Sequence, residues 1–189
     1  MKAELKRLVS RIHKHLGIPV PETQDLLTPD ELSSMRRRIP FATTELFDWL
    51  QVCNPCVTNL FPYFEGIAPG TYADRIIGEI EFRKEVDGMF VDSFVGWTSS
   101  TNDACRHELS WRESWIPIGE FNGDLLFIDC DPSPDGRIGQ VVETSDDGRY
   151  LTVIGHSIHH WMTRLCAAID SPNEHPEYNS VYLGPAPVE

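Results

Sequence analysis

The run from Asp129 to Gly136 (Asp-Cys-Asp-Pro-Ser-Pro-Asp-Gly) places oxygen-bearing side chains at alternating positions. This spacing is typical of the first half of a calcium-binding loop. The calcium template requires glycine at its sixth position and a bidentate glutamate at its twelfth. The chain has Pro134 and Gln140 at these positions. We therefore interpret the run as a rigid acidic turn and predict no bound metal.

Three histidines, His156, His159 and His160, lie around the predicted start of the last helix. His156 and His160 have the spacing of neighbours on one helical face. However, His156 precedes the predicted helix cap, Ser157, and no glutamate completes an H-E-x-x-H zinc motif. We therefore interpret His159 and His160 as adjacent histidines on an exposed helical face.

The five cysteines include one C-x-x-C sequence, Cys53-Asn-Pro-Cys56. A redox pair of this kind is expected at the start of a helix that follows a strand, whereas this pair follows a helical pattern. A zinc site would need a second ligand pair, for which Cys105 and His107 are available. Reduced thiols are our interpretation, and structural zinc is the alternative.

The sequence contains no compact catalytic signature. G-x-S-x-G, a Walker loop, G-x-G-x-x-G and a local catalytic-cysteine motif do not occur in it. We therefore predict a protein that is not an enzyme and that uses no cofactor. A hydrolase with a dispersed active site remains the alternative.

Tryptophan and aspartate supply the candidate partner contacts. Three tryptophans lie within 19 residues, at positions 97, 111 and 115. Tryptophan is enriched at interface hot spots, although it is also a common core residue. The residues that we predict to contact a partner are Trp97, Trp111, Asp129, Asp131 and Asp135.

The charge of the chain is strongly asymmetric. It carries 16 basic and 29 acidic residues, a net charge of −13, divided into +3 over residues 1–38 and −16 over residues 39–189. An acidic body repels phosphate backbones, so we expect no direct nucleic-acid binding and a basic protein partner. No apolar run approaches the ~20 residues of a spanning helix, and no leader peptide is recognisable. We therefore expect no membrane association and a cytoplasmic location.

Hydrophobic periodicity predicts three helices in the N-terminal part of the chain. The first is a basic amphipathic helix over residues 1–17. Thr28, followed by Pro-Asp-Glu, predicts the start of the second helix, and Thr43 or Thr44 is expected to cap the third. Residues 74–86 are ambiguous and are compatible with a further helix.

The second half of the chain has short β-type runs separated by turn signals. Residues 89–98 have strand composition, and Asn-Gly and Asp-Gly turns divide residues 115–154 into an antiparallel meander. Ser157 is expected to cap the closing helix. The four runs of the meander are residues 115–121, 124–130, 138–144 and 149–154.

These elements and the chain length predict a single α+β domain. We expect an antiparallel or mixed sheet over about residues 89–154, with N- and C-terminal helices packed on one face. The predicted core of the domain spans residues 28–170. Residues 171–189 are rich in proline and are predicted to form an extended tail.

The string from Trp115 to Leu165 is specific enough to suggest a family. It combines Trp-Ile-Pro-Ile, a glycine before a strand that ends in Asp129, a Pro-x-Pro-Asp-Gly turn, Gly-Gln-Val and a closing helix. In these features the chain resembles the SUKH superfamily, whose founding members are the yeast Smi/Knr regulators of cell-wall synthesis. The residues that carry the resemblance are Trp115, Pro117, Gly123, Gly136, Gly139, Gln140 and Trp161.

The resemblance implies an α+β interaction module without enzymatic activity. Compact bacterial members of the superfamily are similar to immunity proteins, which bind a cognate toxin domain, often a nuclease, in the cytoplasm of the producing cell. Toxin nucleases have basic clefts, to which an acidic protein is attracted. We therefore expect an immunity protein that neutralises a basic toxin domain by direct binding. The alternative is a regulatory scaffold of the Smi/Knr type in cell-wall-synthesis signalling.

Overall fold

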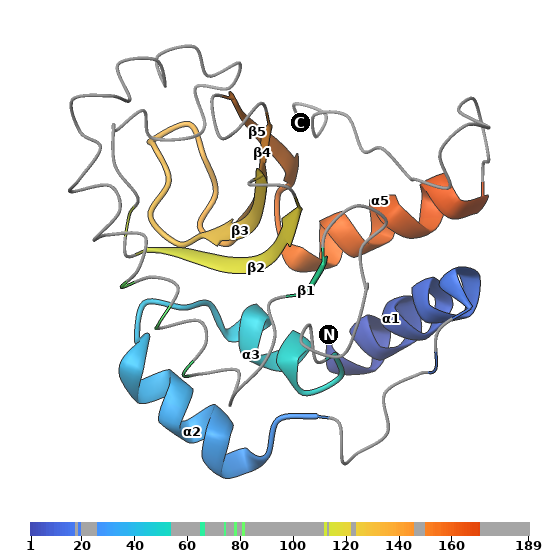
Figure 1. The fold of residues 1–189 in the computed structure, drawn as a ribbon, viewed down its shortest axis with the longest axis horizontal. Helices are drawn as coiled ribbons and strands as arrows, with labels where there is room; N and C mark the ends of the chain where they lie inside the picture. Colours follow the sequence, from blue (N-terminus) through green and yellow to red (C-terminus); the bar gives the residue numbers. More distant parts are fainter. Residues whose placement is uncertain are drawn as a thin grey trace.

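The structure is a computed structural model (Figure 1), and it is an α+β fold as predicted. Its helices are α1 (Lys2–Leu16), α2 (Pro29–Arg38), α3 (Thr44–Leu50) and α5 (Ile158–Asp170). Its strands are β1 (Glu65–Gly66), β2 (Trp115–Phe121), β3 (Asp124–Asp129), β4 (Gln140–Ser145) and β5 (Tyr150–Gly155). The described residues are 1–17, 19, 26–53, 65–66, 74, 78, 81, 112, 114–121, 124–145 and 150–170.

Local capping chemistry fixes the starts of the helices near the N-terminus. Thr28 and Glu31 form a reciprocal capping box at the start of α2, in which the Thr28 hydroxyl accepts the Glu31 N–H. Thr43 caps α3 by accepting the N–H of Leu46 at 3.3 Å. At the C-terminal end of α1, Gly17 adopts a left-handed φ of 68°, a conformation that favours glycine. The predicted starts of α2 and α3 and the predicted end of the first helix at Gly17 are confirmed, whereas α3 ends at Leu50.

The five strands found among the described residues form one antiparallel sheet in the order β1-β2-β3-β4-β5. The predicted four-strand meander is therefore confirmed, and its sequence order is also its spatial order. The short strand β1 adds an edge beside β2 that the sequence did not predict. The pairing of β2 with β3 shifts register between Pro117 and Gly119, where proline has no N–H to donate to the ladder.

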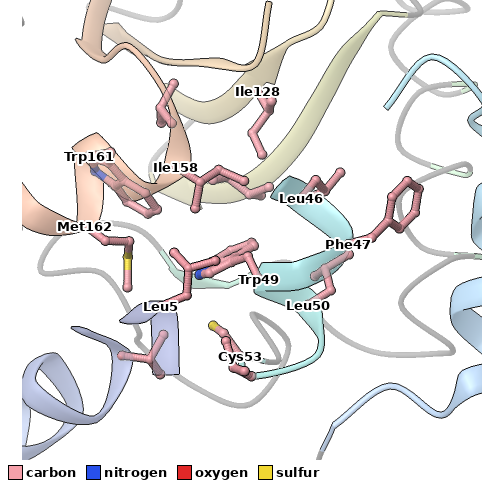
Figure 2. Packing of buried hydrophobic residues seen from close by; sticks show 14 of the residues in the cluster. Leu5, Leu46, Phe47, Trp49, Leu50, Cys53, Ile128, Ile158, Trp161 and Met162 are labelled. Atoms are coloured by element: carbon pink, nitrogen blue, oxygen red, sulfur yellow. The ribbon is translucent and has the colours of Figure 1, made fainter. Parts of the chain in front are cut away.

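The main hydrophobic core lies between the helices and one face of the sheet. Figure 2 shows Trp49 of α3 beside Ile158 and Trp161 of α5, with Leu5 of α1 and Cys53 below it. The Trp49 and Trp161 rings meet edge to face, with centroids 6.3 Å apart. From the sheet, this cluster receives Ile116, Ile118, Leu126, Ile128, Val141 and Ile154.

The opposite face of the sheet carries a second buried cluster. Its residues alternate along the strands with those of the main core, as the two-residue period of a strand requires. Trp115 and Phe127 stack there with ring centroids 4.6 Å apart. The described helices lie on one face as predicted, while the second face is also buried. The members of this cluster are Trp115, Leu125, Phe127, Val142, Leu151 and Val153.

Helix α1 belongs to the domain core and is not a separate arm. Figure 1 shows α1 beside α5, and its apolar stripe of Leu5, Leu8, Val9 and Ile12 is buried in the main cluster. Arg11 forms an ion pair with Asp170 at the end of α5. The basic helix thus contributes both apolar area and charge pairing to the fold.

Two predicted elements lie outside the described residues. These are the strand at 89–98 and the extended tail at 171–189. Within 74–86 only Asp74, Gly78 and Glu81 are described, and all three are helical. Among the described helices, none is long and apolar enough to cross a bilayer.

His13 gives the fold a specific dependence on pH. Its side chain is buried on α1, and its Nδ1 lies 2.6 Å from the carbonyl oxygen of Pro19. Burial lowers the pKa of His13 below its ordinary value of 6.5, and the hydrogen bond to Pro19 opposes this shift. The unfolded chain therefore binds the proton more readily, and stability is lost as pH falls below 6.5.

We expect His13→Gln to flatten this pH dependence. The measurement is the free energy of urea unfolding at about pH 7.5 and about pH 5.5, on either side of the ordinary histidine pKa. His15→Gln is the matched control, because His15 is exposed on the same helix. If both variants lose stability on acidification as strongly as the parent does, His13 is not the responsible group.

Candidate interaction surface

The acidic turn predicted from the sequence is the β3–β4 loop, residues 130–139, and it is built on buried polar groups. Asp129, the last residue of β3, is fully buried, and Gln140, the first residue of β4, is 1% exposed. Gln140 Nε2 donates to Asp129 Oδ2 at 3.1 Å, and the Asp131 N–H donates to Asp129 Oδ1 at 3.0 Å. The Arg137 N–H completes the network by donating to Gln140 Oε1 at 3.1 Å.

The prediction that Asp129 contacts a partner is wrong. A fully buried carboxylate cannot touch another protein, and both of its oxygens accept hydrogen bonds from within the chain. Burial raises the pKa of the Asp129 carboxyl, while the hydrogen bonds from Asp131 and Gln140 and the nearby Arg112 charge oppose this shift. Asp129 is therefore a structural residue that shapes the loop.

The other two aspartates of the turn differ in their availability. The Asp131 carboxylate accepts a hydrogen bond from Arg112 at 2.6 Å, and its side chain is 46% exposed. Asp135 at the tip of the loop is exposed. Trp97 and Trp111 lie outside the described residues, so their prediction as partner contacts stays a prediction.

The described residues that carry the family resemblance have structural roles. Trp115, Pro117 and Trp161 are buried, and Gln140 holds the network around Asp129. Gly139 has a φ of 87°, a left-handed conformation that favours glycine. Gly136 donates its N–H to the Ser133 carbonyl at 2.9 Å and so closes the turn. Gly123 lies outside the described residues.

Two exposed apolar residues, Ile138 and Phe41, were not predicted from the sequence to lie at the surface. Ile138 falls in a run predicted as strand, but β4 begins only at Gln140, and Ile138 is 70% exposed in the loop. Phe41, in the turn between α2 and α3, is 38% exposed. The Pro-x-Pro-Asp-Gly sequence that ends at Gly136 could have indicated that Ile138 belongs to a longer loop and not to the strand.

The N-terminus of α5 is saturated by side chains of the protein itself. Glu45 from α3 accepts the N–H groups of Ile158 at 3.1 Å and His159 at 2.9 Å. The Ser157 hydroxyl accepts the N–H of His160 at 3.1 Å, which confirms the predicted cap. The Glu45 carboxylate thus occupies the position at which a helix terminus would bind an external anion.

The histidines around α5 contact one another and helix α1. The rings of His156 and His160 stack with centroids 5.1 Å apart, and the His156 N–H donates to His160 Nδ1 at 3.2 Å. His159 Nε2 lies 3.6 Å from Glu4 Oε2 on α1. Within the described part of the chain, no group of three or more acidic, histidine or cysteine side chains is placed to hold a metal ion.

The described cysteines are buried thiols. Cys53, Cys130 and Cys166 are all buried, and no two of them are joined by a disulfide. Burial raises the pKa of Cys130 to about 12, so it is not poised as a thiolate nucleophile. Cys56, the second residue of the C-x-x-C pair, lies outside the described residues, as do Cys105 and His107.

The described residues carry only part of the negative charge of the chain. The described residues include 11 basic and 15 acidic residues, a net of −4 out of the total of −13. The greater part of the acidic excess therefore belongs to residues outside the described ranges. Long-range attraction of a basic partner is a property of the whole chain and not of the β3–β4 loop alone.

No known protein family and no curated protein matches this sequence. The resemblance to the SUKH superfamily consequently remains a prediction that rests on the residues between Trp115 and Leu165.

Proposed function

We propose that the protein is a non-enzymatic immunity protein that acts in the cytoplasm and neutralises a basic toxin domain by direct binding. The observation that carries this proposal is the preorganised β3–β4 loop on an acidic chain. A buried Asp129–Gln140 pair and two prolines fix a loop whose tip is exposed. A loop that is already ordered loses less conformational entropy when it binds than a flexible one does.

Electrostatics favours a basic protein as the partner. The net charge of −13 attracts a basic domain during diffusional encounter and repels nucleic acid. An acidic protein that covers a basic cleft competes there with a nucleic-acid substrate. Neutralisation by occlusion would bury about 1,600 Å² in total, the standard size of a specific interface.

The proposal is tested with a toxin domain encoded beside the gene. We expect the purified protein to bind that domain stoichiometrically in calorimetry and to protect cells that express it. The association rate should fall by about tenfold or more between low and high salt, because steering is screened. A toxin that kills equally well with and without this protein would refute the proposal. Recovery of a cell-wall-synthesis regulator as the specific stoichiometric partner would favour the scaffold alternative.

A further inference from the structure

Two loops that are far apart in the sequence approach each other closely. A Cβ atom added to Gly139 in the β3–β4 loop would lie 2.9 Å from Thr43 Cγ2, so the loop backbone approaches the turn between α2 and α3 closely. Each loop exposes one large apolar side chain: Ile138 precedes Gly139 in the sequence, and Phe41 lies two residues before Thr43. Apart from Met1, these are the exposed large hydrophobic residues in the described part of the chain.

The exposure of Ile138 does not result from a loose loop. The Gly139 N–H donates to the Asp129 carbonyl at 2.7 Å, and the Arg137 N–H is held by Gln140. These hydrogen bonds fix the backbone on both sides of Ile138, whose side chain still remains 70% exposed. A rigid backbone that presents an aliphatic side chain to solvent is suited to fill an apolar pocket on a partner.

The charges of the β3–β4 loop nearly cancel. Asp131 is paired with Arg112, while Asp135 and Arg137 are both exposed. The charges of this loop therefore contribute little to holding a partner, and the apolar side chains are left as the source of a slow dissociation rate. The net charge of −13 acts at longer range and selects a basic partner.

We infer that Phe41 and Ile138 together form the apolar anchor of the surface that binds the basic toxin domain. This inference rests on the proposed function and names the surface that performs it. The partner it requires is a basic domain that presents an apolar pocket beside its basic cleft. Attraction by the acidic chain brings the domain to the surface, and burial of the two side chains retains it.

The test compares variants in binding to the purified toxin domain encoded beside the gene, measured by surface plasmon resonance. Ile138→Ser is expected to weaken binding by about 30-fold, the size of an interface hot spot, mainly through faster dissociation. Phe41→Ser is expected to act in the same direction. Ala167→Ser is the control, because Ala167 is exposed on α5 and belongs to neither loop, and we expect this variant to bind like the parent.

A charge variant tests the choice of a basic partner separately. Arg37 is exposed at the end of α2, just before the turn that carries Phe41. Arg37→Glu removes a charge that repels a basic domain, so we expect faster association at low salt. Slower association of this variant would contradict a basic partner at this surface.

Failure of the surface and failure of the function give different results. If the parent binds the toxin domain and both serine variants bind within threefold of it, another surface is used and the inference is overturned. If the parent itself does not bind, the proposed function fails, and the inference falls with it. Because both side chains are exposed, we expect parent and variants to have equal unfolding midpoints. Equal midpoints would show that a loss of binding does not result from a loss of folding.

Discussion

Replacing Trp49 with alanine is expected to lower the free energy of unfolding by about 3–5 kcal/mol, the usual cost of removing a buried tryptophan. Trp49 is fully buried, and its ring meets that of Trp161 with centroids 6.3 Å apart. Figure 2 shows its side chain at the centre of the core, between α3 and α5. Because small domains are stable by only about 5–15 kcal/mol, this loss is a large fraction of the total.

Urea unfolding followed by circular dichroism measures this effect. Phe41→Ala is the matched control, since it also removes an aromatic ring but from a side chain that is 38% exposed. We expect the control to lower the free energy of unfolding clearly less than Trp49→Ala does, because less apolar area is buried at a partly exposed ring. If the two variants were equally stable, Trp49 could not occupy the centre of the core.

Features governed by local chemistry were predictable from the sequence. The capping box at Thr28, the cap at Thr43 and the left-handed Gly17 each depend on residues within one helical turn. The meander of β2 to β5 was also predictable, because its strands are separated by turn residues and pair with their sequence neighbours. No long-range information is needed for either kind of feature.

Features that depend on distant partners were not predictable. Asp129 lies two residues after Phe127 and belongs to the same buried face of β3, yet an aspartate in a turn sequence suggests exposure. Its burial is tolerated because Gln140 lies opposite it on β4, and that pairing is set by the register of the sheet. The capping of α5 by Glu45 likewise joins residues 113 and 114 positions apart.

The candidate surface also combines a feature that was predictable from local sequence with one that depends on distant residues. The sequence predicted a rigid turn between β3 and β4, and that turn is confirmed by its hydrogen bonds. The sequence placed the partner contacts on the aspartates, because charge is the visible signal in a turn. The contact between Gly139 and Thr43, which brings Ile138 to the turn of Phe41, joins two separate segments and is visible only in the fold.

Gly155→Ala is expected to be strongly destabilising, although it adds a single methyl group. A Cβ at Gly155 would lie 2.5 Å from Trp161 Cβ and 2.9 Å from Trp161 Cα. Since real Cβ atoms essentially never approach other atoms closer than 3.0 Å, the backbone of α5 must move away from β5. Overpacking of a core typically costs about 1–3 kcal/mol, and movement of backbone places this variant at the upper end or beyond.

The same substitution at Gly78 is expected to have the opposite sign. Gly78 is helical and exposed, and a Cβ added there meets nothing within 4 Å. Alanine stabilises an exposed helical position by about 0.5–1 kcal/mol relative to glycine. Urea unfolding of the two variants therefore separates steric exclusion from the general effect of replacing glycine.

If Gly155→Ala were as stable as the parent, α5 could not be docked on β5 at this distance. The Trp49–Trp161 contact depends on that docking, so it could not form as described either.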